Sequence, residues 1–342
     1  MRVTSLMLAE AREAPARVAA MLAEDAELYA ALGARLRADQ PSFAVTIARG
    51  SSDHAAAYAA SLIGMAAGRA TVTLAPSLVT RYRARIAMRG ALALGLSQSG
   101  ASPDIVSGLA SARAAGAITV AIVNAAGSPL AGEAEFVLPQ RAGEERSVAA
   151  TKSFVLTLVA VARLVAAWTE DTALAQALAR LPDSLSAALA CDWSAAVPAL
   201  VAARDLYVVG RGPGLAIAQE SALKLKETCR LHAEPFSAAE IQHGPREMVD
   251  DGFPVLAYAL ADPGGEDARA LAAELAGAGV PVLLASHLPG PGLHLPLPPS
   301  LHPLLDPIAA ILAFYPLAEA VSRARGLDPD MPRALHKVTL TT

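Results

Sequence analysis

The sequence predicts an α/β protein built from two doubly wound parallel sheets that follow each other along the chain. Short apolar runs alternate with helical patterns, which is typical of βαβ units whose parallel sheet is covered by helices on both faces. This order of segments occurs twice, before and after about residue 195. The chain has 342 residues, of which 54% are hydrophobic, so it is long and apolar enough to form two such cores.

The first half begins with helical periodicity over residues 5–38. Residues 43–64 then have the pattern of a buried strand, a Gly/Ser turn and a helix, and residues 89–116 repeat that order. Residues 117–140 supply a third strand, a turn and a fourth short strand. These segments together predict one doubly wound unit.

A long helical stretch from about residue 151 to 202 leads into a second copy of this pattern. Residues 205–227 match 43–64, with Gly210–Arg211–Gly212 in place of Ala48–Arg49–Gly50. Further matches are 254–279 with 89–116, and 280–290 with 117–127. The predicted organisation is a helical segment at 1–40, a first domain at 41–195, a second domain at 196–327 and a C-terminal tail at 328–342.

Composition argues against several functional classes. Charged residues are 18%, aromatic residues 4% and the formal net charge is −4, so neither a basic stripe nor a base-stacking surface for nucleic acid is expected. Cys191 and Cys229 have no metal-ligand spacing and indicate a reduced compartment. The first 15 residues contain acidic residues where a signal peptide would be apolar. Charged residues, Gly or Pro interrupt the later apolar runs before they reach about 18 residues, the length that a membrane span requires. We expect a soluble cytoplasmic protein that needs no metal or cofactor and binds no membrane.

A hydroxyl-rich turn, SQSGASPD (97–104), follows the apolar strand of the segment 89–116. In parallel sheets, ligands bind beyond the carboxyl ends of the strands, where this turn lies. Helix capping would explain Ser102 and Pro103, but it leaves Ser97, Gln98 and Ser99 unexplained. Free N–H groups of the following helix and the serine hydroxyls therefore predict a phosphate site that uses no metal.

A second serine turn, ARGSSDH (48–54), ends the preceding strand. Ser51 and Ser52 are expected to reach the same ligand from this neighbouring loop. The turn of the second half that corresponds to SQSGASPD is ADPGGED, which has lost most of the hydroxyls. The serines are therefore not required by the fold itself, and two such turns suit a polyhydroxylated, phosphorylated ligand.

The helical segment 219–234 carries Glu220, Lys224 and Glu227 at spacings i, i+4 and i+7, which place them on one face. A solvated face with Glu–Lys pairing is one interpretation. Because this helix follows the GRGPG turn, it begins at the ligand edge of the second sheet. The other interpretation is that a carboxylate beside an ammonium moves a proton on a bound carbon acid.

Two further residues are candidates for chemistry. His243 precedes Gly-Pro, which ends any helix and exposes the imidazole on a turn. Lys337 lies close to the chain end, where it is either a frayed residue or an amine for a carbonyl substrate.

These motifs together resemble the sugar isomerase (SIS) family, whose fold is a flavodoxin-like three-layer sandwich. Within it they resemble the isomerase half of glucosamine-6-phosphate synthase and stand-alone relatives, including a type of glucosamine-6-phosphate deaminase. Five collinear motifs carry the resemblance: SQSGASPD (97–104), SVAATKSF (147–154), ESALKLKE (220–227), HAEPFSAAEIQHGP (232–245) and DPDMPRALHKVTLT (328–341).

The resemblance implies a role for each matching residue. Ser51, Ser52, Ser97, Gln98, Ser99 and Ser102 would hold the sugar phosphate, and Val148 and Ala150 would line the sugar. Glu227 would move the proton between C1 and C2, with help from Lys224. His243 would open the ring from a partner subunit, which implies a homodimer, and Lys337 would contact the open-chain carbonyl or form a Schiff base with it.

Several positions depart from the family pattern. Arg2 stands where the synthase has a nucleophilic cysteine, and the glutaminase is not expected in this chain. Ala150 replaces a serine, and Arg49 replaces a cysteine. Gln242 stands where the synthase has lysine, and His336 where alanine is usual.

The resemblance implies deamination and isomerisation of glucosamine 6-phosphate to fructose 6-phosphate and ammonia. Amino transfer with ammonia from a separate protein, or action on a fructosamine phosphate, is the enzymatic alternative. A sugar-phosphate sensor without catalysis is the alternative from another class, although Glu227, His243 and Lys337 are all present.

Overall fold

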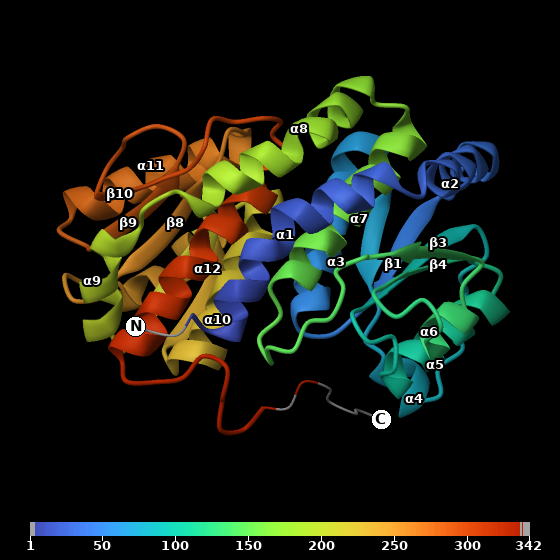
Figure 1. Cartoon of the computed structure of the whole chain (residues 1–342), viewed down its shortest axis with the longest axis horizontal. Helices are drawn as coiled ribbons and strands as arrows, with labels where there is room; N and C mark the ends of the chain where they lie inside the picture. The colour runs from blue at the N-terminus through green and yellow to red at the C-terminus, as the bar shows by residue number, and fades with distance from the viewer. Residues whose placement is uncertain (1–3, 336, 338–342) are drawn as a thin grey trace. The chain divides into compact units, whose positions relative to one another are not determined.

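The computed structural model describes residues 4–335 and 337, and its core consists of two parallel five-stranded sheets (Figure 1). The first-sheet unit comprises residues 16–145, 153–179 and 337, and the second-sheet unit comprises residues 4–15, 146–152 and 180–335. Each unit has its own sheet and its own buried apolar core. His336, Arg2 and residues 338–341 of the last motif lie outside the described residues.

The elements of the first half are α1 (Leu6–Ala23), α2 (Ala26–Asp39), β1 (Phe43–Ile47), α3 (Ser51–Leu62), η1 (Ile63–Ala67), β2 (Ala70–Thr73), α4 (Ser77–Thr80), β3 (Ala91–Ser97), α5 (Pro103–Ala114), β4 (Ile118–Val123), α6 (Pro129–Gly132), β5 (Phe136–Pro139), α7 (Lys152–Thr169) and α8 (Thr172–Leu189). The predicted helical segment 5–38 is two helices, because Asp25 takes a left-handed conformation (φ 61°) between them.

The elements of the second half are η2 (Ser194–Ala196), α9 (Val197–Ala202), β6 (Asp205–Gly210), α10 (Pro213–Cys229), β7 (His232–Ser237), η3 (Glu240–His243), η4 (Pro245–Met248), β8 (Val255–Ala259), α11 (Pro263–Gly277), β9 (Val282–Ser286), β10 (Leu293–Pro296) and α12 (Asp306–Ala324). The sequence pattern did not identify β2, β7, β10 or α12.

Both sheets have the same strand order, which confirms the predicted duplication. The first is β2-β1-β3-β4-β5 and the second, read from its other edge, is β7-β6-β8-β9-β10. All strand pairs are parallel, with Ile47 of β1 opposite Gly95 of β3. In this doubly wound order the direction in which successive strands are added reverses between β1 and β3, and ligands of such folds bind beyond the carboxyl ends of the strands at this point.

The turns after the first strand of each sheet have the same backbone conformation. Gly50 has φ 56° and ψ −133°, and Gly212 has φ 54° and ψ −131°. A side chain is strained at such positive φ values, so glycine is required at both positions. The matched turns connect β1 to α3 and β6 to α10, so the internal repeat includes the connection from strand to helix as well as the strands and helices themselves.

Helix α7 is the most apolar long helix of the first half. In the part of the chain that the structure describes, it is long and apolar enough to cross a membrane, and α8 with the segment Ser194–Ala202 passes the same test only as a pair bent by 50°. The α7 residues are 89% buried within the protein. We therefore interpret α7 as a core helix, in which Arg163 donates to the carbonyl oxygens of Met21 and Glu24.

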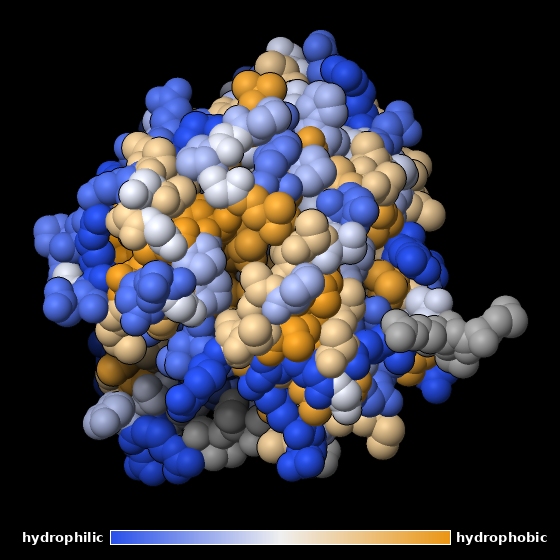
Figure 2. Space-filling model, turned by 90° about the vertical axis from the view of Figure 1, so that its left-hand side faces the viewer, coloured by the Kyte–Doolittle hydropathy of each residue, from blue (hydrophilic) through white to orange (hydrophobic). Residues whose placement is uncertain are grey.

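Exposed apolar side chains in the second-sheet unit include Leu6, Met248, Leu288 and Met331. On the face drawn in Figure 2, apolar residues gather near the centre of the view and hydrophilic residues surround them. Individual exposed apolar side chains such as the four named above are normal on a folded protein, so they do not by themselves identify a binding surface.

Candidate functional site

The two serine turns of the first-sheet unit lie at the carboxyl ends of neighbouring strands. β1 and β3 are paired, and each is followed directly by its turn and then by a helix, α3 or α5. Ser51 and Ser52 are the first two residues of α3, so their backbone N–H groups are among those without an acceptor inside the helix. The prediction that both turns serve one edge of the sheet agrees with this arrangement.

Hydroxyl groups of the 97–104 turn stabilise its backbone. The Ser97 hydroxyl accepts the Gly100 N–H at 3.0 Å, and the Ser99 hydroxyl accepts the Ala101 N–H at 3.3 Å. Ser102 is the N-cap residue of α5 but its side chain makes no capping hydrogen bond. Capping therefore does not account for the Ser102 hydroxyl. The hydroxyl oxygens of Ser97 and Ser99 accept hydrogen bonds within the turn, so their O–H hydrogens can still be donated to a ligand.

An ion pair joins the two serine turns. Arg49, in the β1 turn, donates through Nε to Oδ2 of Asp104 at 3.0 Å. Asp104 is 1% exposed, and its Oδ1 also accepts the Ile105 N–H at 2.9 Å. Arg49, where the family has cysteine, thus fixes the β1 turn to the first turn of α5.

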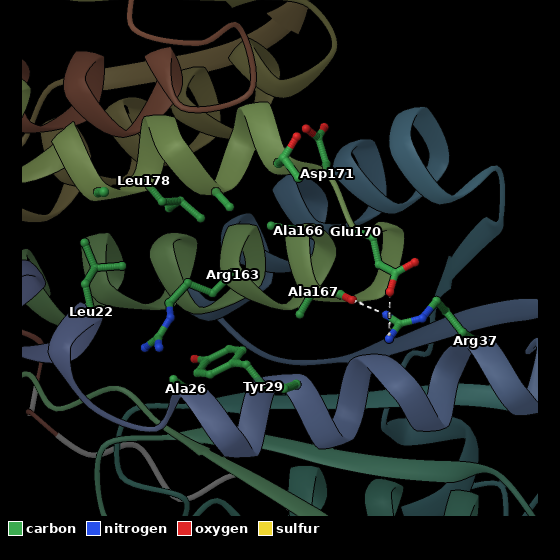
Figure 3. Close-up of a pocket in the computed structure, with 14 residues that line it drawn as sticks. Leu22, Ala26, Tyr29, Arg37, Arg163, Ala166, Ala167, Glu170, Asp171 and Leu178 are labelled. Carbon is green, nitrogen blue, oxygen red and sulfur yellow. Dashed lines mark hydrogen bonds and ion pairs between the residues drawn. The ribbon is translucent and has the colours of Figure 1, made fainter.

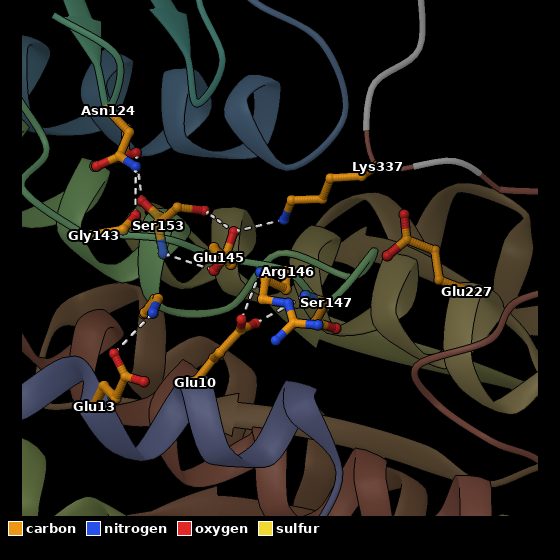
Figure 4. Close-up of polar contacts among 12 residues, drawn as sticks. Glu10, Glu13, Asn124, Gly143, Glu145, Arg146, Ser147, Ser153, Glu227 and Lys337 are labelled. Carbon is orange, nitrogen blue, oxygen red and sulfur yellow. Dashed lines mark hydrogen bonds and ion pairs between the residues drawn. The ribbon is translucent and has the colours of Figure 1, made fainter.

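Lys337 is held by a buried carboxylate within the first-sheet unit (Figure 4). Its Nζ donates to Oε2 of Glu145 at 3.0 Å, and the Glu145 side chain is fully buried. Glu145 also accepts from the Ser153 N–H at 3.1 Å and from the Ser153 hydroxyl at 2.6 Å. The tail residue predicted to react with a carbonyl is therefore in a defined position.

The second-sheet unit contains Val148 and Ala150, in the loop that precedes α7. Both are half-buried. Ser147, which precedes Val148, is 1% exposed, and Ala149, which lies between the two, is 2% exposed. This alternation leaves the two predicted sugar-lining residues on the open side of the loop. Glu10 of α1 holds the loop backbone, as Figure 4 shows.

On α10 the three predicted charged residues form one buried cluster. Lys224 is 1% exposed, its Nζ lies 3.4 Å from Oε1 of Glu220, and it also donates to Glu227. Glu220 is fully buried, and the Glu227 side chain is 21% exposed. The interpretation as a solvated face is therefore wrong, because only Glu227 of the three is open to solvent.

Electrostatics keep the Lys224 ammonium charged. Burial lowers the pKa of Lys224, but the carboxylates of Glu220 and Glu227 outweigh burial, so that the pKa is raised above its ordinary value. A lysine in this state donates hydrogen bonds and does not act as a base. Glu227 is therefore the member of the cluster that can exchange a proton with a ligand.

The position of Glu227 differs from the one expected from the start of its helix. α10 begins at Pro213, at the carboxyl edge of the second sheet, and ends at Cys229. Glu227 is on the last turn, about 20 Å from the helix start at 1.5 Å per residue. Glu227 therefore lies at the opposite end of α10 from the carboxyl edge of the second sheet, at which this helix begins.

His243 lies at the end of η3, and its side chain is exposed. The following Gly244 has φ 127°, which ends the helical turn as the Gly-Pro pattern predicts. Gln242, at the family's lysine position, accepts from Arg246 at 3.0 Å. The histidine is thus presented outward on a tight turn.

A separate pocket of about 520 Å³ lies among α2, α7 and the start of α8 in the first-sheet unit (Figure 3). Its lining is mostly alanine and leucine, and it includes none of the predicted site residues. Its charged residues have partners, as Arg37 pairs with Glu170 at 3.3 Å and Asp171 accepts the Leu174 N–H at 2.9 Å. We therefore assign it no part in the chemistry.

An ion pair lies at the carboxyl end of β9 in the second sheet. His287 Nε2 lies 3.2 Å from Oδ2 of Asp306, which is 3% exposed. Burial lowers the pKa of His287, but the Asp306 carboxylate and the Pro298 carbonyl outweigh burial and raise it above 6.5. His287 was given no role in the sequence, and here it stabilises the start of α12.

We expect this pair to stabilise the fold more at pH 6 than at pH 9. The pKa of His287 is raised on folding, so its contribution is complete below the unfolded value of about 6.5 and is lost as pH rises through the folded value. The difference in melting temperature between the wild type and His287→Gln measures this contribution. A difference that grows with pH would contradict the assignment, and His54→Gln is a control substitution at a histidine outside this ion pair.

Several residues of the site were missed in the sequence. Glu145 and Glu10 contact the predicted groups, and only Glu145 had a local signal, because it lies two residues before the SVAATKSF motif. Arg49 was noted in the sequence, but its ion pair with Asp104 was not predicted. The partners of Glu10 are 136 and 137 positions away, and no local pattern identifies such a pair.

Comparisons with known proteins agree with the fold and the motifs. The SIS domain model matches residues 41–167 and 199–286. The glutamine–fructose-6-phosphate aminotransferase [isomerizing] of Zymomonas mobilis is 35% identical over an alignment of 274 positions, and the match covers 75% of this chain and 45% of that protein. The chain thus spans less than half the length of the curated relatives that it matches.

Solved structures match nearly the whole chain. A crystal structure from Silicibacter pomeroyi DSS-3, provisionally described as a phosphosugar isomerase, has a TM-score of 0.92 and 42% identity, and the match covers 96% of this chain and all of that one. The C-terminal domain of glucosamine-fructose-6-phosphate aminotransferase from Francisella tularensis shares the fold, with a TM-score of 0.86, 24% identity and coverage of 97% and 99%. Glucosamine-6-phosphate deaminase from Thermotoga maritima also shares it, with a TM-score of 0.77, 19% identity and coverage of 98% and 100%. With the family model matching more than half of its residues, this chain belongs to the SIS domain family.

Proposed function

We propose that this chain is an amino-sugar phosphate isomerase that converts glucosamine 6-phosphate and water to fructose 6-phosphate and ammonia. The observation that supports this most is the cluster on α10, in which a partly exposed carboxylate, Glu227, is backed by a buried ammonium, Lys224. An arrangement of this kind suits proton transfer on a carbon acid. The relatives at about one-third identity are isomerising aminotransferases of a hexose 6-phosphate, which points to the same class of substrate.

Glu227 is the proposed acid/base of the reaction. After ring opening exposes the C1 aldehyde, its carboxylate removes the proton on C2, the electron pair forms the C1–C2 double bond, and O1 takes a proton from water to give an enolamine. The same carboxyl group then returns the first proton to C1 while the nitrogen gives up one N–H proton to water, which leaves an imine at C2 and a hydroxyl at C1. Water adds to the imine, and ammonia leaves as the C2 ketone forms, so that all atoms balance.

Lys224 is the proposed positioning residue for Glu227. The Lys224 side chain is 1% exposed, so we propose that its ammonium acts through Glu227 and does not contact the ligand. The family resemblance implies only that Lys224 assists in the proton transfer. Its hydrogen bond holds the Glu227 carboxylate in one orientation.

The serine turns of the first-sheet unit are the proposed phosphate site. Ser51, Ser52, Ser97, Gln98, Ser99 and Ser102 supply donors beside the N-termini of α3 and α5. Phosphate is remote from the carbons that react, so its binding energy is available to position the sugar. The substrate proposed for this site is a phosphorylated hexose or hexosamine.

His243 and Lys337 complete the proposed catalytic set. The exposed His243 is proposed to open the sugar ring from a partner subunit of a homodimer. Lys337 is proposed to contact the open-chain carbonyl, with Glu145 as the residue that holds its amine. A cytoplasmic location is part of the same proposal.

A panel of hexosamine 6-phosphates and fructosamine 6-phosphate tests the function. With purified full-length chain, the expected result is release of free ammonia and formation of fructose 6-phosphate from glucosamine 6-phosphate. Turnover only of fructose 6-phosphate with added ammonium salt would favour amino transfer instead. Binding of the sugar phosphates by calorimetry without any turnover would favour a sensor and overturn the proposal.

A further inference from the structure

Two carboxylates of α1 hold the loop 146–151 at its two ends. Oε1 of Glu10 accepts the Arg146 N–H at 2.6 Å, and Oε2 accepts the Ser147 N–H at 3.1 Å. Three residues further along α1, Oε2 of Glu13 lies 2.8 Å from Nζ of Lys152, the first residue of α7. Residues three apart lie on one face of a helix, so one face of α1 holds the whole loop.

The Glu10 contacts are buried and specific. Glu10 is 5% exposed and Ser147 is 1% exposed. A carboxylate has two acceptor oxygens, and here each oxygen takes one of two successive backbone N–H groups. A glutamine at this position has one acceptor oxygen and one NH₂ group. It can therefore accept a hydrogen bond from one of these N–H groups, while its NH₂ group, which is itself a donor, faces the other.

Helix α1 is itself fixed where it begins. Oδ2 of Asp330 accepts the Leu6 N–H at 2.7 Å, and Oδ1 accepts the Met7 N–H at 2.9 Å. Asp330 belongs to the C-terminal motif of the sequence. A charged acceptor at a helix N-terminus is stabilising, so α1 is a defined support for the loop that it holds.

We propose that Glu10 is a positioning residue for the sugar-binding loop. By fixing the backbone of Arg146 and Ser147, it sets the register that leaves Val148 and Ala150 on the open side of the loop. The inference rests on the proposed function, in which these two residues line the sugar. Because Glu10 acts on the loop and not on the serine turns, it affects sugar recognition separately from phosphate binding.

Glu10→Gln in the full-length chain tests this role, with Glu27→Gln as the matched control on an exposed face of α2. For Glu10→Gln we expect kcat/KM with glucosamine 6-phosphate to fall about tenfold or more, because the reacting carbons are displaced. Inhibition by inorganic phosphate is expected to stay within about twofold of the wild type, since the turn that binds it is intact. The control is expected to match the wild type in both measurements.

Hydrogen exchange followed by mass spectrometry supplies a readout that does not depend on activity. Faster exchange in peptides covering 146–151, with unchanged protection of the sheet strands, is expected for Glu10→Gln. Unchanged kcat/KM in this variant, or a parallel loss of phosphate inhibition and of protection throughout the chain, would overturn the inference. If the wild type turns over no sugar phosphate, the proposed function fails, and unchanged exchange in the loop would then overturn the role of Glu10 on its own.

Discussion

Replacing Glu227 with glutamine is expected to reduce turnover of glucosamine 6-phosphate by about 10²–10⁴-fold, the usual contribution of a positioned acid/base. The amide is nearly the same size as the carboxylate and still accepts a hydrogen bond from Lys224, but it cannot take the C2 proton. Binding of the sugar phosphate is expected to persist, because the proposed phosphate donors are Ser51, Ser52 and the 97–104 turn.

Exchange of the C2 proton with deuterated solvent, followed by proton NMR, measures the step directly. The wild type is expected to exchange this proton, and Glu227→Gln is expected not to. Glu266→Gln, at an exposed glutamate of α11, controls for loss of a surface charge. Loss of sugar-phosphate binding in Glu227→Gln would show that this carboxylate binds the ligand and does not carry the proton.

Lys224→Met is expected to lower the free energy of unfolding by about 3–5 kcal/mol, which is the usual loss when one partner of a buried ion pair is removed. Glu220 is fully buried, and Lys224 is its ion-pair partner at 3.4 Å. Without the ammonium, the buried Glu220 carboxylate loses the positive charge that offsets the cost of burying it. Urea unfolding followed by circular dichroism measures the change.

The double variant Glu220→Gln/Lys224→Met distinguishes this cause from simple loss of packing. Removing both charges together is expected to recover most of the stability, because no uncompensated buried charge remains. Lys226→Met, at the exposed neighbouring lysine, is expected to change stability by less than about 0.5 kcal/mol. If the double variant is as unstable as Lys224→Met, the buried charge is not the cause.

The duplicated fold could be predicted from sequence because its signals are local. Each strand–turn–helix unit fits within about 25 residues, and the turns at Gly50 and Gly212 repeat in both composition and backbone conformation. β2 was missed because its four residues are mostly exposed and lack the continuous apolar run of a buried strand. β7 was missed because Glu234 and Pro235 interrupt its apolar pattern.

Burial at the candidate site could not be predicted from spacing. Helical spacing placed Glu220, Lys224 and Glu227 on one face, but it did not show which of them solvent reaches, since that depends on packing by distant segments such as α12. Likewise, the support that Glu10 and Glu145 give to neighbouring loops depends on tertiary contacts. The roles of the individual residues stay predictions until the variants are measured.

The matched glycine turns also have a consequence for protein engineering. Since the backbone at Gly212 follows the same path as at Gly50, the copy that lost its serines kept the scaffold on which they were mounted. Replacing Pro213 and Gly214 with serines, as at the matching Ser51 and Ser52 of the first turn, is therefore a way to ask whether the second half of a duplicated protein gains anion affinity when these side chains are supplied.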